Sequence, residues 1–179
     1  MTFDVDEQLS ELPPHAYLQQ TARAYRFLDR YTAARVSMRG VVDGPTFNDV
    51  EDFMWAFFQN CWHIKDWLRH DFTVDEKVRA TIVAAAESEP DLRVVADLAN
   101  GSKHFARDLK RERTGAYDGA VEFRDGAHGT VTVEHMIVFL AGQRVSAVEL
   151  GIRAMRAWQR LFEEAGLHRF VDPPSSPSA

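Results

Sequence analysis

The sequence predicts a mainly α-helical fold, a helical bundle with a small antiparallel β-hairpin or ribbon inserted before the last helix. Apolar residues recur at three- and four-residue steps through most of residues 14–107, which is the spacing of a buried helix face. Between residues 120 and 134 the pattern becomes an alternation that favours strands, and the helical spacing returns from residue 146. Because 179 residues suit one core, we expect a single domain over residues 1–171.

The two ends of the chain are expected to differ from this domain. Residues 1–12 are expected to be a frayed lead-in, and residues 172–179 a disordered tail rich in proline and serine. Pro13 and Pro14 then open a helix to about residue 38, because proline is tolerated in the first helical turn. The apolar face of this helix consists of Leu18, Ala22, Tyr25, Leu28 and Tyr31.

Residues 47–71 are expected to form the central helix of the bundle. Its core-facing stripe consists of Phe53, Phe57, Cys61, Ile64 and Leu68. A second stripe beside it carries polar or amphipathic heads, namely Asn60, His63, Asp66, Trp67 and His70, with Lys65 next to them. Since residues three and four apart share a helix face, this flank of a mostly buried helix is our first candidate binding site.

A third helix is expected over residues 73–87 and a fourth over residues 88–107, with Ser88 and Asp91 placed as a capping pair. On the fourth helix, Asp97, Asn100 and His104 share one face, and Lys103 lies at its edge. Gly101 costs a helix up to about 1 kcal/mol relative to alanine. We therefore expect another helix or a ligand to approach the backbone closely at this position.

The residues around this glycine suit the binding and cleavage of a phosphodiester. Lys103 would neutralise the phosphate, His104 would exchange protons, and Asn100 would orient the substrate. Asp97 and Arg107 would lie beside them as further binding residues. The alternative is a helix-packing glycine next to a hydrogen-bonded Asn–His pair, followed by a solvated basic helix end.

The ribbon is expected at about residues 119–140. Residues 120–124 and 130–134 would pair around a turn, and residues 136–140 are either a third strand or the hairpin's continuation past a bulge. Ser146 and Glu149 have the spacing of a capping box for the last helix, which would end before Gly166.

Composition narrows the classes of function. A net charge of −6 argues against broad, non-specific nucleic-acid binding, although Lys103, Arg107, Lys110, Arg111 and Arg113 form a local basic patch. The single cysteine excludes an internal disulfide and suits the cytoplasm, and the acidic first residues are not those of a signal peptide. No apolar run has the length of a membrane span, so no membrane partner is expected.

The sequence contains few residues whose spacing is typical of a metal site or of a catalytic nucleophile. His63, Asp66 and His70 have a spacing that could ligate a metal, but the central helix lacks the ExxH motif of di-metal bundles, so we expect no metal and no cofactor. Cys61 lies on the apolar stripe, where a buried inert thiol is expected. The sequence contains no glycine-rich phosphate loop, GxSxG, CxxC or HExxH motif.

Helix layout and the Asn100…His104 pair resemble the HEPN superfamily of nucleotide-binding helical domains, over roughly residues 14–113. Active members are metal-independent ribonucleases that act across a dimer. The resemblance implies engagement of RNA or a nucleotide, a homodimer, and a toxin–antitoxin or antiphage setting. Ala99 stands at the arginine position of that family, so Lys103 or Lys65 would have to supply the charge. The competing hypothesis is a non-catalytic protein-interaction module with a buried polar network.

Overall fold

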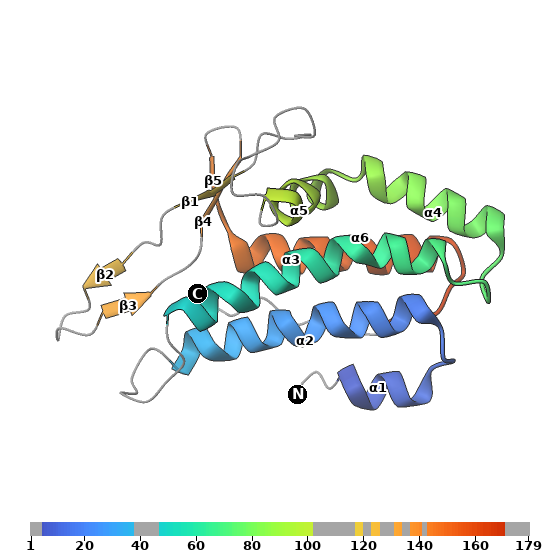
Figure 1. Cartoon of the computed structure of the whole chain (residues 1–179), viewed down its shortest axis with the longest axis horizontal. Coiled ribbons are helices and arrows are strands. Elements are labelled where there is room, and N and C mark those ends of the chain that lie inside the picture. Colours follow the sequence, from blue (N-terminus) through green and yellow to red (C-terminus); the bar gives the residue numbers. More distant parts are fainter. Residues whose placement is uncertain are drawn as a thin grey trace.

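A computed structural model describes residues 5–37, 47–101, 117–119, 123–125, 131–133, 137–140 and 143–170 (Figure 1). The helices in this part of the chain are α1 (Val5–Glu11), α2 (Ala16–Ser37), α3 (Phe47–Arg69), α4 (Glu76–Ser88), α5 (Pro90–Gly101) and α6 (Ala147–Glu164). The predicted mainly helical bundle is therefore confirmed. No helix of the described residues is long and apolar enough to cross a membrane.

Helices α2 and α3 pack side by side, with α6 behind them (Figure 1). Helix α1 lies along the outer side of α2, where Arg26 pairs with Asp6, and α4 and α5 lie on the opposite side of α3. At one end of the bundle, on the right in Figure 1, α2 begins and both α3 and α6 end. This end therefore gathers segments that are far apart in the sequence.

The core lies where α2, α3 and α6 meet. The largest fully buried side chains are mainly aromatic and include Tyr17, Tyr25, Phe57, Phe58, Trp158 and Phe162. Gly151 of α6 lets the helices approach closely, because a Cβ atom there would lie 3.0 Å from Leu28 and 3.0 Å from Phe57. Burial of such side chains contributes about 1.5–3 kcal/mol each.

Several helix starts differ from the prediction. Helix α2 begins at Ala16 rather than at Pro13 and Pro14, and α5 begins at Pro90 rather than at residue 88. Residues 5–11 form α1 rather than a frayed lead-in, and this helix packs against α2, where Arg26 pairs with Asp6. Helix α4 begins at Glu76, not at residue 73, because Asp75 acts as its N-cap. The Asp75 carboxylate accepts hydrogen bonds from the backbone N–H groups of Lys77 at 2.9 Å and Val78 at 3.2 Å.

The predicted Ser88 cap is wrong, and the predicted Ser146 cap is correct in position only. Ser88 belongs to the end of α4, where its hydroxyl donates to the carbonyl oxygen of Ala85 at 2.9 Å, so it does not cap α5. Ser146 occupies the N-cap position of α6 but makes no capping hydrogen bond through its side chain. Ser146 and Glu149 therefore have the sequence spacing of a capping box, but Ser146 does not make the hydrogen bond that defines one.

Short strands lie between α5 and α6. They are β1 (Tyr117–Gly119), β2 (Phe123–Asp125), β3 (Val131–Val133), β4 (Ile137–Leu140) and β5 (Gln143–Ser146). Strands β2 and β3 pair antiparallel, and β4 pairs antiparallel with both β1 and β5. Strand β5 was not predicted, and it leads directly into α6. The expected tail over residues 172–179 lies outside the described residues.

Candidate functional site

The predicted polar stripe on α3 will be called the α3 flank and comprises Asn60, His63, Asp66, Trp67 and His70. Two of its residues lie at the seam with α2. Gln20 of α2 donates from Nε2 to the backbone oxygen of Asn60 at 2.9 Å and to its Oδ1 at 3.1 Å. The Arg23 guanidinium lies 5.1 Å from the centre of the Trp67 ring. These contacts explain part of the stripe as helix packing.

Asp66 lies at the other edge of the α3 flank. It accepts from Lys65 Nζ at 2.9 Å and from Arg69 at 3.2 Å, both on the same helix. Lys65 is mostly buried, and its ammonium also lies 4.8 Å from the centre of the Trp62 ring. Arg69 reaches Glu87 of α4 at 3.6 Å, so this edge of α3 is turned towards α4.

The second predicted group is on α5, which packs against α3. Asp97 is buried there, with 7% of its surface exposed, and Asn100 is half-buried one turn further along. Lys103, His104 and Arg107 lie outside the described residues. The expected meeting of His63 and Asp66 with His104 therefore stays a prediction. On the α3 side, His63 is half-buried and His70 is exposed.

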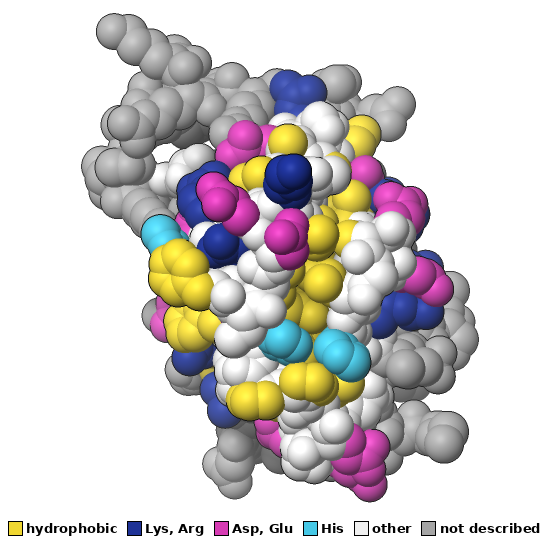
Figure 2. All heavy atoms as spheres, turned by 90° about the vertical axis from the view of Figure 1, so that its right-hand side faces the viewer, with side chains coloured by type: hydrophobic (Ala, Val, Ile, Leu, Met, Phe, Trp, Pro, Cys, Tyr) yellow, Lys and Arg dark blue, Asp and Glu magenta, His cyan; other side chains and the backbone are white. Residues whose placement is uncertain are grey.

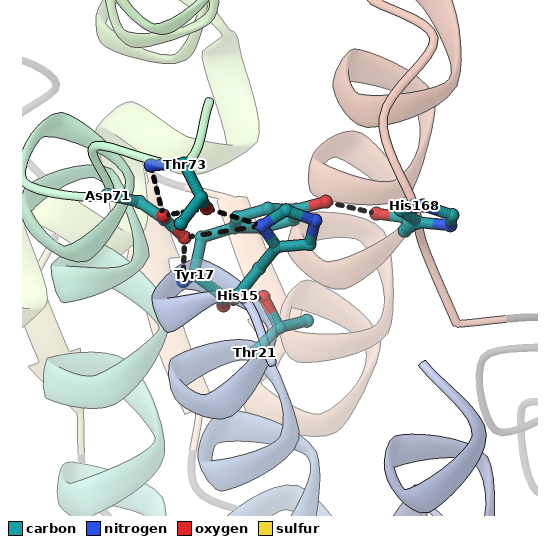
Figure 3. A network of polar contacts seen from close by, with 6 residues as sticks. All are labelled: His15, Tyr17, Thr21, Asp71, Thr73 and His168. Carbon is teal, nitrogen blue, oxygen red and sulfur yellow. Dashed lines mark hydrogen bonds and ion pairs between the residues drawn. The ribbon is translucent and has the colours of Figure 1, made fainter. Parts of the chain in front are cut away.

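A different polar group gathers at the end of the bundle (Figure 3). It will be called the bundle-end network and comprises His15, Tyr17, Asp71, Thr73 and His168. Asp71 is 3% exposed and lies at its centre. One of its oxygens accepts from the backbone N–H of Tyr17 at 3.3 Å, and the other accepts from both the backbone N–H of Thr73, at 3.2 Å, and its hydroxyl.

The environment of Asp71 fixes its charge. Burial would by itself raise the pKa of this carboxyl, but hydrogen bonds from Thr73 and from the backbone N–H groups of Tyr17 and Ala16 hold the pKa below its ordinary value. Asp71 thus caps the N-terminus of α2 from outside that helix, and the positive end of the helix dipole favours its negative charge.

The hydrogen bonds of Thr73 determine the tautomer of His15. The carboxylate of Asp71 can only accept, so the Thr73 hydroxyl uses its single proton there. The Thr73 oxygen must then accept from Nδ1 of His15, which is 2.6 Å away. A proton on Nδ1 leaves Nε2 of neutral His15 with a free lone pair.

The segment after α6 completes the bundle-end network. The Tyr17 hydroxyl donates to the backbone oxygen of His168 at 2.9 Å, and the rings of His15 and His168 stack with their centres 5.8 Å apart. Burial, with a smaller effect of the Asp71 charge, raises the pKa of the Tyr17 phenol, so this hydroxyl remains a donor. Two residues later, Phe170 is fully buried against Tyr25. The bundle-end network therefore connects the start of α2, the turn after α3 and the segment after α6.

Sequence patterns had not identified the bundle-end network. Asp71 and Thr73 have the spacing of an Asx turn after a helix, which is a local signal for a cap. Nothing local connects them with His15, which is 58 positions from Thr73.

Cys61 is buried, and burial raises the pKa of its thiol to about 12, as suits an inert core residue. Within the described part of the chain, no group of three or more His, Cys, Asp or Glu residues is placed to hold a metal ion.

Comparison of the chain with models of known protein families, with curated proteins and with solved structures finds no match.

Proposed function

We propose that the protein is a HEPN-like helical domain that engages RNA or a nucleotide where α3 meets α5. One observation supports this proposal: α5, which carries Asp97 and Asn100, packs against the helix that carries His63 and Asp66. Both groups of candidate residues therefore lie on neighbouring helices. The sequence continues from α5 directly into Lys103, His104 and Arg107, which would add the positive charge that a phosphate requires.

The residues differ in the role proposed for each. Asn100 would hold the ligand by hydrogen bonds, Lys103 would neutralise a phosphate, and His104 would transfer protons if the ligand is cleaved. Ala99 offers no charge in place of the family's arginine, and Lys65 already lies between Asp66 and the Trp62 ring. We therefore propose binding as the main activity, with metal-independent ribonuclease activity dependent on Lys103.

The experiment is a binding titration with purified protein, using fluorescence anisotropy of labelled single-stranded RNA and of a labelled nucleotide. We expect Asn100→Ala and His104→Ala to weaken binding at least tenfold. The control is Gln19→Ala, which removes an exposed amide of α2 that belongs to neither group of candidate residues. Unchanged binding and unchanged RNA cleavage in His104→Ala would refute the proposal.

The proposed assembly is a homodimer, because HEPN-like domains pair through the helices that carry their site. Light scattering at micromolar concentration tests it. A mass near twice the 20.4 kDa of one chain is expected, and a mass near 20.4 kDa would refute the dimer.

A second candidate is a non-catalytic protein-interaction module. It is favoured by the intramolecular contacts of the α3 flank, since Asn60 bonds to Gln20, Trp67 packs under Arg23, and Asp66 pairs with residues of its own helix. Under this function His104→Ala would lower the free energy of unfolding by about 1–3 kcal/mol, the cost of an unpaired buried group, without changing ligand binding. Chemical denaturation of the same variant therefore separates the two functions.

A further inference from the structure

Two histidine side chains lie next to each other on the face of the bundle end shown in Figure 2. In this part of the structure, the ring of His15 stacks on that of His168 with an angle of 27° between the ring planes. His168 is exposed and His15 is partly exposed, so a solute can reach both rings.

The bundle-end network prepares His15 for ligation. Asp71 accepts from Thr73, Thr73 accepts from Nδ1–H of His15, and Nε2 makes no hydrogen bond within the described residues. A histidine that ligates a metal almost always donates its other ring N–H to a carboxylate, a carbonyl or a water, which fixes the ring and raises its basicity. Here the Thr73 hydroxyl lies between the Asp71 carboxylate and the ring, so the carboxylate orients His15 through Thr73.

The second histidine is held nearby by its backbone. The Tyr17 hydroxyl bonds to the carbonyl oxygen of His168 at 2.9 Å, while the imidazole of His168 makes no hydrogen bond within the described residues. Metal–nitrogen bonds of about 2.0–2.1 Å place two imidazoles that share one ion with their ring centres about 5–6 Å apart. The observed separation is 5.8 Å, and rotation about the broad terminal torsion of exposed His168 turns a nitrogen towards the ion.

We propose that His15 and His168 bind one divalent transition-metal ion of the zinc or copper class, through Nε2 of His15 and a ring nitrogen of His168. Imidazole is a preferred ligand of these ions. Because two side chains supply only part of a coordination shell, water or a small anionic ligand completes it. This site is distinct from the α3 histidines, and it does not rest on the proposed RNA or nucleotide function.

The first experiment is calorimetric titration of chelator-treated full-length protein with zinc chloride, in a buffer that does not bind zinc. We expect one equivalent to bind, and His15→Gln and His168→Ala each to weaken binding at least tenfold. The control is His70→Ala, which removes another exposed histidine and should leave binding unchanged. Thr73→Val should weaken binding about 10- to 100-fold, the usual effect of losing a residue that orients a metal ligand.

The second experiment uses copper(II) and electron paramagnetic resonance on the same proteins. We expect hyperfine structure from two nitrogens in the wild type and from fewer in each single variant. His168→Ala removes an exposed side chain, so this variant tests the proposal even if His15→Gln fails to fold. Binding that survives both histidine variants, or that falls equally in His70→Ala, would mean an adventitious ion only and would overturn the proposal.

Discussion

The α3 flank and the bundle-end network are two polar groups that meet at the end of α3, yet they are built differently. The α3 flank comes from one helix, and its carboxylate, Asp66, is 40% exposed and paired with neighbours on that helix. The bundle-end network joins the start of α2, the turn before α4 and the segment after α6, and its carboxylate, Asp71, is 3% exposed.

This difference determines what each group contributes. A surface ion pair contributes at most about 1 kcal/mol, because water and salt screen it and two long side chains must be ordered. A buried carboxylate that accepts several hydrogen bonds is strongly coupled to folding, because its loss leaves buried donors unpaired. We therefore expect Asp71 of the bundle-end network to contribute more to stability than the exposed Asp66 of the α3 flank does.

The largest expected effect is that of Asp71→Ala. The substitution leaves the N–H of Tyr17 and both donors of Thr73 without their acceptor, and removes the cap of α2. We expect the free energy of unfolding to fall by about 2–3 kcal/mol. Chemical denaturation at pH 7 measures it, with Asp52→Ala as the control on an exposed carboxylate of α3. Equal effects of the two substitutions would mean that the burial and hydrogen bonds of Asp71 add nothing to stability.

The next largest effect on stability is expected from substitution of Asp29 in α2. This carboxyl is half-buried, and burial is the only cause of its pKa shift, whereas hydrogen bonds offset the burial of Asp71. Burial raises the pKa of Asp29 from 3.8 to about 6. The folded state therefore favours the protonated form, and the contribution of Asp29 to stability falls as the pH rises through about 4 to 6. We expect Asp29→Asn to stabilise the protein by about 1–2 kcal/mol at pH 7, less than the full shift implies because the group is partly exposed.

Denaturation curves at several pH values test this. The advantage of Asp29→Asn over the wild type should shrink between pH 7 and pH 4 and then disappear. An advantage that is constant with pH would show that ionisation of Asp29 is not its cause.

The fold was more predictable than the polar contacts. Periodic apolar residues such as Leu28, Phe57 and Met155 located the long helices, because burial of one face repeats at every turn. Helix starts were less predictable. Asp75 and Ser88 are both residue types that cap helices, but only Asp75 caps one here, and Ser88 is the last residue of α4. Short α1 was missed because its stability comes from packing on α2.

The α3 flank was recognisable because helical spacing alone places Asn60 and Trp67 on one side. Its partners Gln20 and Arg23 were not predicted, since they belong to another helix. The bundle-end network needs three segments to meet, and no local pattern predicts that His168 lies beside His15. Contacts of this kind follow from the fold and cannot be read from residue spacing.

Loss of the Asn60–Gln20 pair is expected to change the free energy of unfolding less than substitution of Asp71 or Asp29. It joins α2 and α3 by two hydrogen bonds from one amide, at 2.9 and 3.1 Å. We expect Asn60→Ala to cost about 1 kcal/mol, because the backbone oxygen of residue 60 still accepts from Gln20. A double-mutant cycle with Gln20→Ala should give a coupling energy of about 0.5 kcal/mol or more, and no coupling would mean that the pair is not formed in solution.

Asp66→Asn is expected to have the smallest effect on stability and is the most informative about function. The side chain is 40% exposed, and Lys65 keeps its contact with the Trp62 ring after the substitution. We therefore expect the free energy of unfolding to change by less than about 0.5 kcal/mol. If Asp66 faces a ligand at the α3–α5 junction, the same variant should change RNA or nucleotide affinity severalfold in the anisotropy titration. A large loss of stability would instead place Asp66 among the structural residues, and the two polar groups would then no longer differ in role.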